Sequence, residues 1–136
     1  MLSDRQVAVL EAAVNRIIPP DQFLGGWEGG VGDYLERQFQ GDLRDKVDAY
    51  AQGLDALDAE AIATMGKAFD ELDTETQDRV LIQIEQGIVK TEWPLDAGAF
   101  FRMMVDHSME GYYSDPGNGG NHAAASWKMI GFEVTD

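Results

Sequence analysis

The sequence predicts an all-α fold: a small single-domain bundle of about five helices over residues 1–136, with an ordered glycine-rich C-terminal loop and tail. Three observations lead to this prediction. Apolar residues recur every three or four positions along most of the chain, which is the spacing of one helix face. Capping residues, prolines and glycines divide the pattern into helix-length segments. No segment shows the strict alternation of apolar and polar residues that is typical of a half-buried strand.

The first helix is expected at residues 3–18. Ser3 is its expected N-cap, and Gln6, three residues later, completes a capping box. Pro19 and Pro20 end the helix, because a residue before proline is driven out of helical geometry. The apolar face of this helix is expected to hold Val7, Leu10, Val14, Ile17 and Ile18.

Two further helices are expected at residues 31–40 and 43–61. A glycine-rich connection precedes them, and Gly41 and Asp42 separate them. An irregular crossing segment follows at residues 65–73. The inward residues of these segments are expected to be Tyr34, Leu35, Phe39, Val47, Tyr50, Ala51, Leu54, Leu57, Phe69 and Leu72.

The last two helices are expected at residues 74–90 and 95–113. Thr74 and Gln77 repeat the capping-box spacing at the start of the first, and the sequence TEWP marks a turn between the two. Their apolar faces are expected to hold Val80, Leu81, Ile84 and Ile88 in the first, and Phe100, Phe101, Met104, Val105 and Met109 in the second.

Composition narrows the function classes. The formal charge is −15, from 10 basic and 25 acidic residues, so no nucleic-acid partner is expected. The chain has no cysteine, which excludes disulfides, thiolate zinc sites and thiol nucleophiles. No apolar run approaches the roughly 20 residues that cross a bilayer, so no membrane insertion is expected. The N-terminus shows no signal peptide, which predicts a cytoplasmic protein, or a periplasmic one if an export signal has been trimmed.

Three kinds of chemistry fit the sequence poorly. The glycines of GGWEGGVG and DPGNGGN lack the spacing and the Lys-Ser/Thr ending of a phosphate-binding loop, and turn geometry accounts for them. His107 and Glu110 share a helix face near His122 and Asp115, but their spacing matches no metal motif. His107 and Glu110 could form a catalytic dyad, but nothing in the sequence indicates the pocket that such a dyad requires. A stand-alone carbohydrate- or metal-binding protein using His107, Glu110 and Asp115 stays open as the alternative.

Residues 110–132 gather large aromatic side chains around glycines and asparagines. Tyr and Trp in such clusters are typical of protein–protein hot spots. The alternative is that aromatics such as Trp127 and Phe132 fill the domain's own core. That alternative is weaker for Tyr112 and Tyr113, because adjacent helical residues cannot both be buried on one narrow face. An acidic adaptor for an unrelated basic partner is a further alternative.

The same segment carries a resemblance to a known family. EGYYSDPGNGGN followed by WKMIGF resembles the C-terminal signature of the gluconate 2-dehydrogenase subunit 3 family. A helix ending in NRIIPPD before a glycine-rich link is similar to that family's start. AYAQGLDALDAEA and the F-x-x-L of AFDELD fall between them in the expected order, so the resemblance covers almost the whole chain.

The resemblance implies a non-catalytic small subunit with no cofactor of its own. Members of this family pair with a large flavoprotein of the glucose–methanol–choline (GMC) type, which holds FAD and oxidises a sugar, a sugar acid or a glycoside. A cytochrome c subunit often passes the electrons onward, and the small subunit supports folding, stability or export of the large one. The resemblance implies that the large subunit is contacted by Tyr112, Tyr113, Asp115, Pro116, Asn118, Gly119, Gly120, Asn121, Trp127 and Lys128.

Two features depart from the family pattern. Many members begin with a twin-arginine export signal, which this sequence lacks. That departure leaves a cytoplasmic complex, such as a glycoside 3-dehydrogenase, as an option. Asn118 also stands where related loops often carry a tyrosine, a change expected to alter local contacts but not the fold.

Overall fold

The computed structural model describes residues 1–20 and 25–114 and builds them from helices joined by short turns. The described part of the chain holds five α-helices and no strand, so the all-α prediction is confirmed. The C-terminal loop and tail of that prediction lie outside the described residues. The helices are α1 (Asp4–Ile17), α2 (Gly32–Phe39), α3 (Val47–Met65), α4 (Thr74–Glu85) and α5 (Ala97–Ser114).

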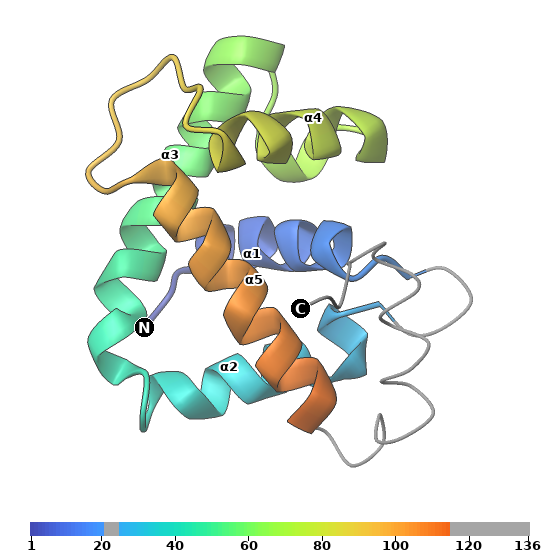
Figure 1. The fold of residues 1–136 in the computed structure, drawn as a ribbon, viewed down its shortest axis with the longest axis vertical. Coiled ribbons are helices and arrows are strands. Elements are labelled where there is room, and N and C mark those ends of the chain that lie inside the picture. The colour runs from blue at the N-terminus through green and yellow to red at the C-terminus, as the bar shows by residue number, and fades with distance from the viewer. Residues whose placement is uncertain (21–24, 115–136) are drawn as a thin grey trace.

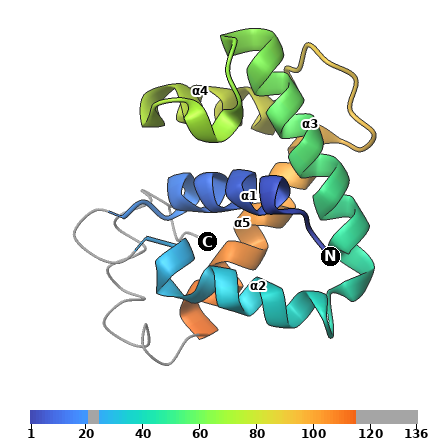
Figure 2. The same cartoon turned by 180° about the vertical axis from the view of Figure 1, so that it is seen from behind.

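Helix α1 lies in the middle of the bundle. In Figures 1 and 2 it runs between α4 on one side and α2 on the other, and α5 crosses it diagonally. It packs against α3, α4 and α5, so its apolar face is covered from several directions. Within residues 1–20 and 25–114, no helix is both long and apolar enough to span a membrane.

Aromatic contacts around Tyr50 join three helices. The Tyr50 ring on α3 is fully buried and meets Phe39 of α2 edge-on, with ring centroids 5.1 Å apart. It meets Phe100 of α5 in the same way, with centroids 5.8 Å apart. Aromatic pairs prefer this edge-to-face geometry over flat stacking, so Tyr50 fixes how α2 and α5 sit against α3.

The starts of two helices test the predicted caps. Ser3 and Gln6 form the expected capping box of α1: the Ser3 hydroxyl accepts from the Gln6 amide, and the Gln6 side chain accepts from the Ser3 amide. The second predicted cap is wrong, because Asp73, not Thr74, accepts from the Thr76 amide. Gln77 is buried instead and donates to the carbonyl of Phe69 over 3.0 Å.

Two helix boundaries also differ from the prediction. A short 3₁₀ turn (η2, Arg44–Lys46) precedes α3. The helix therefore begins at Val47, four residues after the predicted start at residue 43, and it continues to Met65. Helix α4 ends at Glu85, because Gly87 adopts a left-handed conformation with φ of 77°. Ile88, expected on the buried face, is consequently 55% exposed.

A buried carboxylate holds the connection between α4 and α5. Glu60 on α3 is only 2% exposed and accepts hydrogen bonds from the Lys90 amide at 2.7 Å and the Thr91 amide at 3.1 Å. The Thr91 hydroxyl and the Trp93 indole donate to it as well, at 2.6 and 3.2 Å. Burial alone would raise the pKa of Glu60, but these hydrogen bonds outweigh it and lower the pKa below its ordinary value.

Candidate functional site

The C-terminal end of α5 carries the two described residues of the expected partner surface. Tyr112 is fully buried in the core cluster, and Tyr113 is half-buried against it. The two rings meet edge-on, with centroids 5.9 Å apart. Adjacent helical residues point about 100° apart, so one ring anchors the helix while the other lies nearer the surface. Their contact with a large subunit stays a prediction.

Helices α2 and α5 approach each other closely beside these tyrosines. Gly111 is buried, and a Cβ atom at this position would lie 2.8 Å from the Tyr34 ring, so only glycine permits this approach. The Tyr34 hydroxyl donates to the Glu110 carboxylate over 3.1 Å. Burial, and then the neighbouring Glu110 carboxylate, raise the pKa of Tyr34, so the phenol stays protonated as the donor.

His107 lies on α5 one turn before Gly111, and it pairs with Tyr50 of α3. The Tyr50 oxygen and His107 Nδ1 share a hydrogen bond of 2.8 Å, and the two rings are stacked with centroids 5.8 Å apart. Burial lowers the pKa of His107, although Glu110 and Asp106 act in the opposite direction. Burial also raises the pKa of Tyr50 strongly. Both groups are therefore neutral near pH 7, and the pair links α3 to α5.

These contacts bear on the alternative metal or catalytic interpretation. His107 and Glu110 are each hydrogen-bonded to a tyrosine of another helix, and Ser108 beside them is fully buried. Among residues 1–20 and 25–114, no three His, Cys, Asp or Glu side chains gather as a metal site would require. Asp115, the third residue of that interpretation, lies outside the described residues. The described geometry therefore shows a polar contact between helices.

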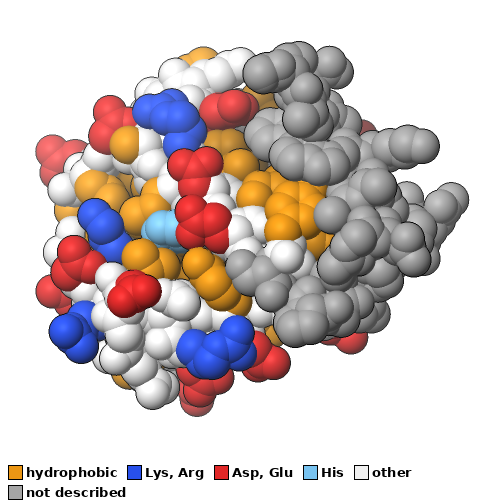
Figure 3. Space-filling view, turned by 60° about the horizontal axis from the view of Figure 1, so that its bottom comes forward, with side chains coloured by type: hydrophobic (Ala, Val, Ile, Leu, Met, Phe, Trp, Pro, Cys, Tyr) orange, Lys and Arg blue, Asp and Glu red, His pale blue; other side chains and the backbone are white. Residues whose placement is uncertain are grey.

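Most of the predicted partner-binding residues are not described by the structure. Those outside the described ranges are Asp115, Pro116, Asn118, Gly119, Gly120, Asn121, Trp127 and Lys128. Their predicted contacts with a large subunit are neither supported nor contradicted by the fold. Figure 3 shows one face of the molecule, on which hydrophobic side chains lie beside acidic and basic ones.

The glycine-rich connection before α2 packs tightly on α1. A Cβ atom at Gly26 would lie 2.8 Å from the Val14 side chain, so glycine is needed for the close approach of the two segments. The connection continues as a helical turn (η1, Trp27–Val31) that is kinked at Gly30 and leads directly into α2. The Trp27 amide donates to the Asn15 side chain on α1 over 3.2 Å. Gly26 thus serves close packing, and Gly30, with φ of 119°, supplies the turn geometry that the sequence predicted for this connection.

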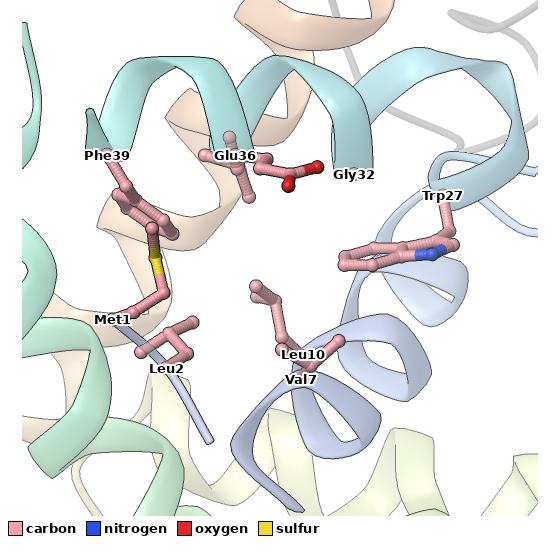
Figure 4. Close-up of a pocket in the computed structure, with 9 residues that line it drawn as sticks. Met1, Leu2, Val7, Leu10, Trp27, Gly32, Glu36 and Phe39 are labelled. Carbon is pink, nitrogen blue, oxygen red and sulfur yellow. The ribbon is translucent and has the colours of Figure 1, made fainter. Parts of the chain in front are cut away.

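A pocket between α1 and α2 was not predicted from the sequence. It has a volume of about 230 Å³ and opens to the surface beside the N-terminus. Figure 4 shows the Trp27 ring on one side of it and Phe39, Met1 and Leu2 on the other. The walls are mostly apolar, and the charged side chain among them is that of Glu36. The pocket is lined by Val7, Leu10, Trp27, Leu35, Glu36 and Phe39 among others.

The sequence held one signal for this pocket. Trp27 lies inside a glycine-rich connection, where a large aromatic side chain has no core role evident from helical spacing. Its position against the pocket depends on how α2 packs on α1, which periodicity alone does not reveal. The pocket is therefore a tertiary feature and became visible only in the fold.

Comparison with known proteins gives one match. A family model described as gluconate 2-dehydrogenase subunit 3 matches residues 4–133 of the chain. No curated protein and no solved structure matches it. The matched range includes all five described α-helices, and the resemblance seen in the sequence is confirmed.

Proposed function

Since the chain belongs to the gluconate 2-dehydrogenase subunit 3 family, we propose that it is a non-catalytic small subunit that binds and stabilises a large FAD-dependent oxidoreductase of the GMC type. In this proposal the large subunit holds the FAD and oxidises a sugar, a sugar acid or a glycoside, with a glycoside 3-dehydrogenase as one candidate. The observation that carries the proposal is the family match, because it spans residues 4–133 and so nearly the whole chain.

Contacts at the end of α5 support an accessory role. His107 and Glu110, the residues best suited to acid–base chemistry, are hydrogen-bonded to Tyr50 and Tyr34 and join α5 to its neighbours. Helix α5 is thereby fixed immediately before the segment expected to contact the large subunit. A fixed attachment reduces the conformational entropy lost when two proteins associate, so this arrangement suits a docking role.

The proposal predicts what accompanies the protein in its host. A tagged copy should co-purify with a large protein that shows the absorbance of FAD, and the complex should oxidise a sugar, a sugar acid or a glycoside. The isolated small chain should carry no flavin and show no dehydrogenase activity. If a cytochrome c subunit belongs to the complex, haem absorbance will appear in the same fraction.

Two results would contradict this function. One is recovery of the tagged chain as a lone monomer from native extract. The other is tight binding of a simple sugar or a metal ion by the isolated chain in calorimetry, which would favour the stand-alone alternative built on His107 and Glu110.

A further inference from the structure

We propose that the pocket between α1 and α2 binds a long basic side chain, an arginine, of the larger dehydrogenase subunit. This inference rests on the proposed function and adds a specific contact to it. Its lining residues come from the N-terminus, α1, α2 and the turn before α2, and they do not include Tyr112 or Tyr113, the described residues of the expected partner surface. It would therefore give the large subunit a second point of attachment.

The size of the pocket suits a side chain better than a substrate or cofactor. Its volume is about 230 Å³, whereas pockets for drug-sized ligands usually measure roughly 300–1,000 Å³. FAD is too large for this space, and a sugar derivative needs several polar partners, whereas Glu36 is, apart from the Trp27 indole, the one polar side chain among the lining residues. A single long side chain inserted from another protein fits the available space.

The lining of the pocket matches the two chemical parts of an arginine. Leu10, Leu35 and Phe39 offer apolar walls for the aliphatic stem, which arginine buries readily while its charged head stays near water. The Trp27 ring also lines the pocket, and an aromatic ring attracts a guanidinium group. Glu36 supplies a carboxylate at the same pocket, and Figure 4 shows it on the α2 side, between Phe39 and Trp27.

Charge favours a basic partner over a second copy of this chain. The protein carries a formal charge of −15, so two copies repel each other. Within residues 1–20 and 25–114, the Lys and Arg ion pairs involve Arg5 and Arg16, and none reaches Glu36. Glu36 is exposed, and its carboxylate is thus available to a cation from outside. Arginine is preferred to lysine, because its planar group pairs with a carboxylate and stacks on an aromatic ring at once.

The Trp27 ring packs on the backbone at the start of α2. Its amide is held by Asn15, and the ring lies against Gly32 at the first turn of α2. A Cβ atom at Gly32 would lie 2.8 Å from the ring, while the backbone of Gly32 has ordinary helical angles that alanine also adopts. Gly32→Ala therefore displaces the pocket wall without straining the helix.

The test uses the complex recovered with the tagged chain. The dissociation constant between the small chain and the purified flavoprotein is measured by biolayer interferometry for wild type and variants. Glu36→Gln should weaken binding about tenfold and Glu36→Arg about a hundredfold, the range expected for a charge-assisted contact. Gly32→Ala should weaken it about tenfold. The matched controls are Glu85→Gln and Glu85→Arg, because Glu85 is an exposed residue of α4 that does not line the pocket. Their dissociation constants should stay within about twofold of wild type.

The outcomes separate the two proposals. If the flavoprotein co-purifies but both Glu36 variants bind as tightly as the Glu85 controls, the pocket inference is overturned and the proposed function stands. If wild type recovers no flavoprotein, both are overturned. A wild-type homodimer that Glu36→Arg dissociates, measured by sedimentation, would also overturn the inference by assigning the pocket to a second copy. Circular dichroism confirms that each variant is folded.

Discussion

Glu60 on α3 and Glu36 on α2 have the same side chain, but Glu60 is buried and Glu36 is exposed. Glu60 is 2% exposed and accepts four hydrogen bonds from residues of the α4–α5 connection. Glu36 is exposed beside an open pocket, and no described lysine or arginine forms an ion pair with it. The carboxylate of Glu60 thus finds its hydrogen-bond partners within the domain. The region around Glu36 has polar and apolar groups that are free to meet another molecule.

Two glycines repeat this difference. Gly53 on α3 is buried, and a Cβ atom there would lie 2.2 Å from the ring of Phe100, which is itself 1% exposed. Gly32 on α2 faces the Trp27 ring, which is only half-buried. A side chain in a closed core has nowhere to move, whereas a ring at an open pocket can rotate. The comparison therefore predicts that changes near α3 affect stability, and changes at the pocket affect binding.

The glutamates give the largest expected difference. Glu60→Gln replaces a charged acceptor by an amide that cannot accept all four hydrogen bonds and leaves buried donors unpaired, which should lower the free energy of unfolding by about 3 kcal/mol. Glu36→Gln should change it by less than about 0.5 kcal/mol, as is usual at an exposed position. Urea denaturation followed by circular dichroism measures both. Equal effects of the two substitutions would break the comparison.

The pH dependence of stability tests the role of Glu60 in the wild-type chain. Its pKa is lowered in the folded state from an ordinary value of 4.5, so the unfolded chain takes up a proton first as the pH falls. The stabilisation from Glu60 is therefore complete above about pH 4.5 and is lost as the pH falls through the lowered pKa. The Glu60→Gln variant should lack this component of the acid response.

The glycines give a smaller difference. Gly53→Ala should lower the free energy of unfolding by about 2 kcal/mol, because the added methyl group overpacks the contact between α3 and α5. Gly32→Ala should change it by less than about 0.5 kcal/mol, since the backbone there is helical and the Trp27 ring can shift. Thermal unfolding of both variants tests this. A stabilised Gly53→Ala chain would show that α3 and α5 are less tightly packed than the structure indicates.

Local sequence patterns predicted much of the fold but little of these two regions. The cap at Ser3 and Gln6 depends on residues three positions apart, and Pro19 ends α1 through its own geometry. Such short-range effects can be read directly from a sequence. The cap at the start of α4 was misassigned because Asp73 and Thr74 are adjacent and both able to cap.

Long-range contacts could not be predicted in the same way. Glu60 meets partners 30 to 33 positions away, and the pocket forms only where α2 packs on α1. His107 and Glu110 were singled out from their spacing, but their tyrosine partners lie 57 and 76 positions away. Periodicity shows which residues share a helix face, but it does not show which faces meet.

His107 gives the smallest expected effect on stability, because it lies between a buried contact and the surface. Burial lowers its folded pKa from an ordinary value of 6.5, so below pH 6.5 the unfolded chain binds a proton before the folded chain does. Stability should therefore be complete above about pH 6.5, decline as the pH falls below it, and level off below the lowered pKa. The decline should be smaller than the loss in Glu60→Gln, since His107 is only half-buried and Glu110 and Asp106 oppose the shift. Urea denaturation between pH 7.5 and 5.5 measures it, with His107→Gln as the variant that should lose this dependence. A rise in stability toward pH 5.5 that is present in wild type and absent in His107→Gln would mean that His107 is charged in the folded chain, and the contact with Tyr50 would then not belong to the closed region.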